Sequence, residues 1–93
     1  MYANKLGYAK VDQSGAGSLV KSGPTGFFGG TVVSSTAATI TVYDNTSATG
    51  DILFQKTGLT AGEVISFGGL GFAAKVGLYV VVGGTGLVNI LYT

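Results

Sequence analysis

The chain of 93 residues contains no cysteine, no histidine, no arginine and no tryptophan. Without cysteine and histidine it lacks the thiolate nucleophile, the imidazole base and the usual zinc ligands. Disulfides and zinc clusters, two common sources of stability in small domains, are excluded for the same reason. We therefore expect a protein that is not an enzyme, and oligomerisation remains as the source of additional stability.

Charge is scarce as well. Charged residues make up 10% of the chain and apolar residues 46%, whereas an average soluble domain is about 25% charged. A monomer of this composition would expose a large apolar surface, which favours an oligomer. The lysines are spread out and the net charge is +1, so we expect no nucleic-acid partner. No apolar run approaches the roughly 18 residues of a membrane helix, and no apolar signal segment follows Met1, so we expect neither a membrane partner nor a secretion signal.

Glycine, threonine and serine are abundant, with 17, 11 and 7 residues. No window repeats apolar residues with helical spacing, and the frequent glycines disfavour helices. Short apolar or alternating runs bounded by turn residues predict β-strands instead. We expect these strands at 18–22, 26–35, 38–44, 51–57, 63–67, 72–74, 76–82 and 87–92.

Glycine clusters interrupt this pattern at three places. Gly29 and Gly30 lie inside the strand 26–35 and predict a β-bulge or a close backbone approach. The Gly-Gly-Thr-Gly segment 83–86 predicts a turn between the last two strands. Neither this segment nor 68–71 precedes a predicted helix, so we interpret both as turns and not as phosphate-binding loops.

Seven or eight short strands at this spacing predict an all-β fold, an antiparallel β-sandwich of jelly-roll type. The strands 38–44 and 51–57 are expected to form a hairpin with a polar loop. The sandwich domain would span residues 16–93. Residues 1–15 are interpreted as an extended N-terminal arm or, alternatively, as the first strand of the core; this segment contains the apolar-leaning residues Tyr2, Leu6 and Tyr8.

The last two predicted strands are apolar on both faces. A strand that covers one core usually alternates apolar with polar residues, and in a chain without helices the second face needs another cover. A second subunit supplies it most simply; a long loop or the N-terminal segment is the alternative. Because Phe27 and Phe28 are adjacent, one of them points away from the core. The outward side chains predict an oligomer interface formed by Tyr79, Val81, Leu87, Leu91 and Phe28.

Four carboxylates are the remaining candidates for chemistry. Asp44 and Asp51 lie at the two ends of one loop, where Asn45 follows directly. Such a pair suits a glycosidase or, with Asn45 and backbone carbonyls, a calcium site. Asp and Asn at strand ends are more often turn residues that hydrogen-bond to the backbone, and this is the role we expect. We predict no catalytic residue, no cofactor and no metal ligand.

Several segments resemble small virion proteins of tailed bacteriophages. In these proteins a strand ends in a Tyr/Trp-Asp-Asn-Thr-like turn, and a Gly-Leu-Tyr-Val strand leads to the C-terminal strand. The similar segments cover most of residues 19–93, namely 22–33, 40–54, 77–85 and 88–92.

The resemblance implies a capsid decoration (cement) protein, a class that is small, β-rich and often trimeric or dimeric. It implies synthesis in the host cytoplasm and a place on the capsid surface of the virion. The implied partners are the major capsid protein and further copies of the chain, with a trimer favoured over a dimer. The capsid contact would then come from the arm, through Tyr2, Leu6 and Tyr8. No catalytic residue is carried over.

Two other functions fit the same sequence. A tail, fibre or head-fibre component would share this composition. A carbohydrate- or host-surface-binding module would use Tyr43 and the loop 45–51.

Overall fold

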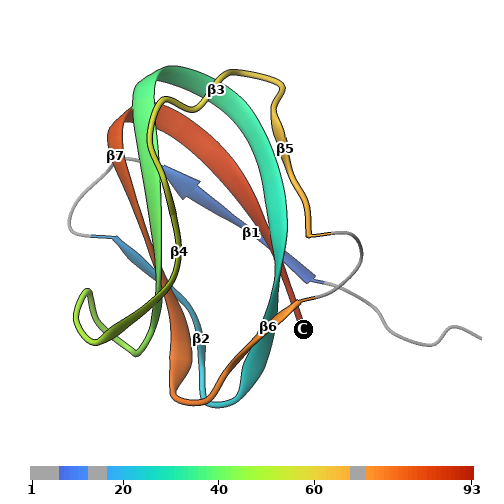
Figure 1. Cartoon of the computed structure of the whole chain (residues 1–93), viewed down its shortest axis with the longest axis vertical. Coiled ribbons are helices and arrows are strands. Elements are labelled where there is room, and N and C mark those ends of the chain that lie inside the picture. The colour runs from blue at the N-terminus through green and yellow to red at the C-terminus, as the bar shows by residue number, and fades with distance from the viewer. Residues whose placement is uncertain (1–6, 13–16, 68–70) are drawn as a thin grey trace, which may run out of the picture.

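The computed structural model describes residues 7–12, 17–67 and 71–93. These residues form an all-β fold with seven strands in one antiparallel sheet (Figure 1). The all-β class and the antiparallel pairing are thereby confirmed, while the jelly-roll sandwich stays a prediction. The strands are β1 (Gly7–Asp12), β2 (Ser18–Ser22), β3 (Thr25–Asp44), β4 (Asp51–Lys56), β5 (Val64–Ile65), β6 (Phe72–Ala74) and β7 (Gly77–Tyr92).

The long strands β3 and β7 organise the sheet. They pair with each other from Phe27 opposite Tyr92 to Tyr43 opposite Tyr79, and Figure 1 shows both curving over at the top of the molecule. The bend divides the sheet into two halves. In one half β1 flanks β7 while β5 and β6 flank β3; in the other half β2 flanks β7 and β4 flanks β3.

The predicted turn at 83–86 is wrong, because these residues lie within β7. The predicted strands 76–82 and 87–92 are therefore joined in one strand, as are 26–35 and 38–44 in β3. Glycine bends the strand here without ending it. Gly84 has a φ of 71°, and a Cβ at this position would overlap the carbonyl oxygen of Ala37, which itself has a φ of 54°. The sheet doubles over where these two backbones meet.

The irregularity predicted at Gly29 and Gly30 is confirmed. The register between β3 and β7 shifts between Phe27 and Gly30. A Cβ on Gly29 would overlap the carbonyl oxygen of Ile65, and a Cβ on Gly30 would overlap that of Asn89. Both the bulge and the close backbone approach therefore require glycine.

One hydrophobic core lies against both halves of the sheet. Phe27 and Val88 come from the first half, Ile40 and Val80 from the second, and all four side chains have 0% exposure. The ring of Phe27 lies 6.1 Å from that of Phe54 in β4, so aromatic packing also joins the halves. Each large buried side chain contributes roughly 1.5–3 kcal/mol of transfer free energy. Because both inner faces share this core, the two outer faces look out on different sides of the molecule.

The described part of the predicted N-terminal arm forms a core strand. β1 pairs with β7 in unbroken register from Gly7 opposite Tyr92 to Asp12 opposite Leu87, and Val11 is fully buried. This matches the alternative interpretation of that segment as the first strand. The predicted arm residues Tyr2 and Leu6 lie outside the described residues.

The predicted hairpin is confirmed. β3 and β4 pair from Ile40 opposite Lys56 to Asp44 opposite Asp51, with a register shift between Val42 and Tyr43. That shift leaves Leu53 as an additional residue in β4.

Candidate functional site

The outer side of β7 carries the predicted interface residues. Leu78, Val80 and Val82 point into the core, and the intervening Tyr79 and Val81 are half-buried on the outer side. The same alternation places Leu87 and Leu91 on the outer side of the second half of β7, beside the buried Val88 and Ile90. The prediction that β7 is apolar on both sides is therefore confirmed, whereas its cover by another subunit stays a prediction.

A row of apolar and aromatic side chains crosses the outer side of the half built from β2, β7, β3 and β4. Leu19 lies opposite Tyr79, Tyr79 opposite Tyr43, and Tyr43 opposite Ile52. Side chains that face each other in this way are in mutual reach. The two ends of the row are open, since Leu19 is 47% and Ile52 50% exposed. We name this row, together with Val81, the tyrosine face.

Uncharged polar residues continue the tyrosine face toward the bend. Thr41 lies opposite Val81 on one side and Gln55 on the other. The Gln55 Nε2 donates a hydrogen bond of 3.1 Å to the Thr41 Oγ1. The tyrosine face and this polar row together contain no Lys, Arg, Asp or Glu.

A second apolar group lies on the outer side of the other half. Tyr8, which is 63% exposed, lies opposite Leu91. Leu91 falls between the register pairs that flank the bulge at 28–29 of β3, so Phe28 is adjacent to it across the two strands, and the Phe28 ring lies beside Gly26 and Gly71. Leu87 lies further along the same strand, opposite Asp12 and Ser34. We name the group of Tyr8, Phe28, Leu87 and Leu91 the β1 face.

The structure thus separates the five predicted interface residues. Tyr79 and Val81 belong to the tyrosine face, whereas Phe28, Leu87 and Leu91 belong to the β1 face. One flat contact does not reach both groups, because the faces look out on different sides. The β1 face instead brings three predicted interface residues together with Tyr8, which was predicted to contact the capsid.

Asn89 lies at the centre of the β1 face, between Leu87 and Leu91. It is opposite Lys10 in β1 and Thr31 in β3. Its Oδ1 is buried and has no hydrogen-bond partner among the described residues. An unpaired buried carbonyl oxygen destabilises the fold, and nothing in the sequence pattern indicated it.

Asp44 anchors a distant turn. Its Oδ1 accepts hydrogen bonds from the backbone N–H groups of Val76 at 2.8 Å, Lys75 at 3.0 Å and Gly77 at 3.4 Å. These bonds, that of Val76 first, hold the pKa of Asp44 below its ordinary value, against an opposing contribution from burial. The expected bond from Asp44 to the backbone of its own turn is therefore wrong: its partners are Lys75 and Val76 in the β6–β7 connection and Gly77 at the start of β7, 31 to 33 residues away.

Asn45 closes the loop that follows. Its Nδ2 donates to the carbonyl oxygen of Thr49 at 2.9 Å, and its Oδ1 accepts from the N–H of Thr46 at 2.7 Å. Asp51 lies opposite Asp44 at the end of the hairpin. Among the described residues, no three His, Cys, Asp or Glu side chains gather as metal ligands would.

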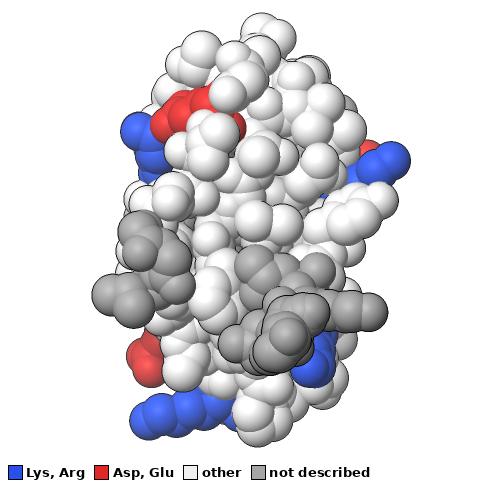
Figure 2. All heavy atoms as spheres, turned by 90° about the vertical axis from the view of Figure 1, so that its right-hand side faces the viewer, with Lys and Arg blue, Asp and Glu red and all other residues white. Residues whose placement is uncertain are grey.

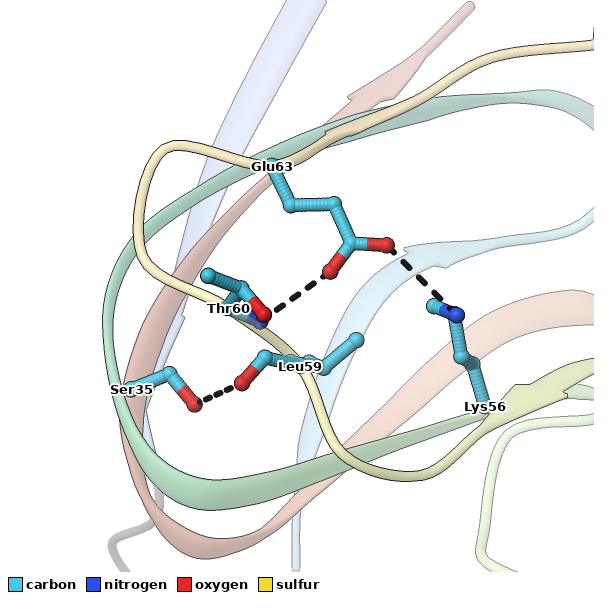
Figure 3. A network of polar contacts seen from close by, with 5 residues as sticks. All are labelled: Ser35, Lys56, Leu59, Thr60 and Glu63. Atoms are coloured by element: carbon cyan, nitrogen blue, oxygen red, sulfur yellow. Dashed lines mark hydrogen bonds and ion pairs between the residues drawn. The ribbon is translucent and has the colours of Figure 1, made fainter.

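A polar network fastens the connection between β4 and β5 to the bend of β3 (Figure 3). The Glu63 carboxylate accepts from the N–H of Thr60 at 3.0 Å and lies 3.6 Å from the Lys56 Nζ. The Ser35 hydroxyl donates to the carbonyl oxygen of Leu59 at 2.6 Å. Sequence reasoning did not find this network; its Ser35–Leu59 bond joins two elements 24 residues apart, whereas the contacts of Glu63 with Thr60 and Lys56 are within one connection.

Seen from the side that carries β5, charged side chains lie mostly near the outline, and uncharged side chains cover most of the described surface (Figure 2). The described residues enclose no pocket. They also include no helix of the length and apolarity that a membrane span requires. Comparisons with protein-family models, with curated proteins and with solved structures found no match to this chain.

Proposed function

We propose that the chain is a non-enzymatic structural protein of a tailed-phage virion, which decorates the capsid as a homo-oligomer and bridges major capsid subunits. The observation that carries this proposal is the pair of outer faces with apolar side chains on different sides of one small sheet; on the β1 face a polar row of Lys10, Asn89 and Thr31 crosses between these side chains. A protein that bridges subunits needs two such surfaces. Covering an apolar side chain such as Leu91 with a partner stabilises the complex.

The two faces suit different partners. The β1 face contains Tyr8, and the segment 1–6 with Tyr2 and Leu6 adjoins it in the sequence. We assign this face to the capsid, with Phe28, Leu87 and Leu91 as further contacts. The tyrosine face, with Tyr79 and Val81, is assigned to a sister copy. Many such weak contacts on one shell add up through effective concentration.

The position of the chain in a virion reconstruction tests the proposal. We expect density for this fold on the outside of the capsid, at junctions between major capsid subunits. Density in the tail or in a fibre would support the rival structural function instead. Absence of the chain from purified particles would refute both.

Co-sedimentation with undecorated capsids tests the assignment of the faces. Leu91→Asp places a charge between Tyr8 and Phe28 on the β1 face and should reduce capsid binding by at least tenfold, which corresponds to about 1.4 kcal/mol. Tyr79→Asp is the matched control on the other face; it should weaken self-association and leave the binding of each copy to the capsid. The opposite pattern would exchange the two assignments.

One observation favours a second candidate, a carbohydrate-binding module. Tyr43 and Tyr79 lie opposite each other on the uncharged tyrosine face, next to the hydrogen-bonded Thr41 and Gln55. Aromatic side chains beside polar groups are suited to the apolar and polar sides of a sugar ring. A hit on a glycan array that Tyr43→Ala abolishes would establish this function, whereas an array without hits would leave the structural function alone.

A further inference from the structure

The free edge of β4 is the longest uncovered strand edge next to the tyrosine face. β4 ends the strand order β1-β7-β3-β4 and pairs with β3 alone among the described strands. An edge strand presents unpaired N–H and C=O groups that another strand can bind. β4 has the sequence Asp-Ile-Leu-Phe-Gln-Lys, without the proline that often protects such edges; it does contain a bulge at Leu53 and the charged residues Asp51 and Lys56, and pairing must accommodate these three residues.

The strand is complementary to itself when it is reversed. In an antiparallel pair of two β4 strands, Asp51 of one copy lies opposite Lys56 of the other, and this happens twice because the contact is symmetric. Both side chains are exposed. Opposite charges facing each other across two strands stabilise the pair, and like charges destabilise it.

Because β4 contains a bulge, the side chains that face each other in this register lie on the same side of the sheet. Ile52 lies opposite Tyr43, and Gln55 opposite Thr41, so both point to the outer side. In a regular strand two residues three apart point to opposite sides. The extra residue Leu53 removes that mismatch, so Ile52 of one copy faces Gln55 of the other on the outer side.

The inner side matches as well. Leu53 and Phe54 are partly buried and pack against the core. In the same register Leu53 of one copy lies opposite Phe54 of the other. The pairing would therefore cover these partly exposed side chains and continue the core from one copy into the next.

From these observations we infer that β4 pairs antiparallel with β4 of a second copy of this chain, across a two-fold axis between Leu53 and Phe54. The occupant is a second copy because the charges, the outer side chains and the inner side chains all match in a single register of the strand with itself. The contact uses neither the β1 face nor the side chains at the centre of the tyrosine face. It goes beyond the proposed function and requires no capsid.

Disulfide cross-linking tests the register, and the cysteine-free chain makes the result specific. In the double variant Ile52→Cys, Gln55→Cys, each new thiol faces one of the second copy at a Cα distance of about 4.5–5.5 Å, which a disulfide spans. We expect a covalent dimer on a non-reducing gel after mild oxidation. The control Ile52→Cys alone offsets the two thiols by three residues, about 10 Å, and should remain largely monomeric on the gel. Equal cross-linking of both variants would overturn the proposal.

Charge exchange tests the same contact without cysteines. Asp51→Lys and Lys56→Asp each create two like-charge pairs and should weaken self-association about tenfold. A mixture of these two variants restores opposite charges and should associate as strongly as the wild type, measured by analytical ultracentrifugation. Glu63→Gln is the control for loss of the Lys56–Glu63 ion pair and should leave association unchanged.

The results separate this inference from the capsid proposal. The β4 contact would be overturned if the mixture of Asp51→Lys and Lys56→Asp failed to associate. It would also be overturned if the wild type formed a trimer and the double cysteine variant did not cross-link. Either result leaves the co-sedimentation assay with capsids as an independent measurement. Circular dichroism on each variant confirms that the sheet is intact, and positions 51, 52, 55 and 56 are all exposed.

Discussion

Asp44 offers the sharpest test of how this sheet is held together. One carboxylate oxygen accepts three backbone N–H groups, those of Lys75 and Val76 in the β6–β7 connection and that of Gly77 at the start of β7. β7 in turn pairs with β1, β2 and β3. Replacement of Asp44 by Ala removes all three bonds at once. The prediction is that Asp44→Ala destabilises the protein measurably, although the side chain lies outside the core.

The magnitude follows from the geometry. Hydrogen bonds to a charged group contribute about 1.5–3 kcal/mol each when they are buried, and less where water replaces the lost partner. The bonds to Lys75 and Val76 are exposed and the bond to Gly77 is long, so we expect a total loss of about 1–2 kcal/mol. In a domain of this size that corresponds to a fall in Tm of about 5–15 °C.

The pH dependence distinguishes this cause from a general loss of packing. Because the folded-state pKa of Asp44 is lowered, its stabilisation is complete above the pKa of the unfolded chain. The stabilisation is lost as the pH falls through the folded-state value. The difference in unfolding free energy between the wild type and Asp44→Asn should therefore be constant well above the ordinary aspartate pKa of 3.8 and shrink as the pH falls below it.

Urea unfolding followed by circular dichroism measures both effects. Asp51→Asn is the control, because Asp51 lies at the other end of the same loop and accepts none of the three bonds. An Asp44→Ala protein with an unchanged Tm would refute the reasoning. A difference that stays constant down to acidic pH would show that the charge of Asp44 is not its source.

The same unfolding assay checks four further predictions. Val11→Ala should cost about 2 kcal/mol, since β1 belongs to the core; an unchanged stability would mean that β1 detaches readily. Gly30→Ala should cost more than about 2 kcal/mol or prevent folding, because its Cβ has no space beside Asn89; a tolerated alanine would contradict the bulge. Asn89→Val should stabilise by about 1 kcal/mol by removing the unpaired oxygen, and destabilisation would reveal a missed partner. Glu63→Gln should change stability by less than about 1 kcal/mol, because the Lys56–Glu63 pair is exposed; a larger loss would show that the pair holds the connection.

Local patterns predicted the strands well where the residues alone carry the signal. The alternation around Ile40 and Val42 predicted the β3–β4 hairpin, and the Gly29–Gly30 pair predicted a bulge. The interpretation of Gly83 and Gly84 as the end of a strand was wrong. A glycine pair permits both a turn and a bend, and only the β3 backbone beside it selects the bend.

The candidate surfaces were predicted in part. The two-sided apolar pattern of β7 identified the outward residues Tyr79 and Leu91, but not that they lie on different sides of the molecule. The row that joins Leu19, Tyr79, Tyr43 and Ile52 depends on the register of four strands. Register between distant strands follows from which side of each strand the core buries, and a single run of sequence does not contain that information.

The sequence by itself determined the class of fold, the absence of cysteine and histidine chemistry, and the apolar character of both sides of β7. These properties follow from composition and from the two-residue period of a strand. Only the tertiary structure decided that β1 is a core strand, that Asp44 holds the connection at 75–77, and that the apolar side chains form two separate faces. The physical reason is that one bend in β3 and β7 turns the two halves of a continuous sheet toward a common core.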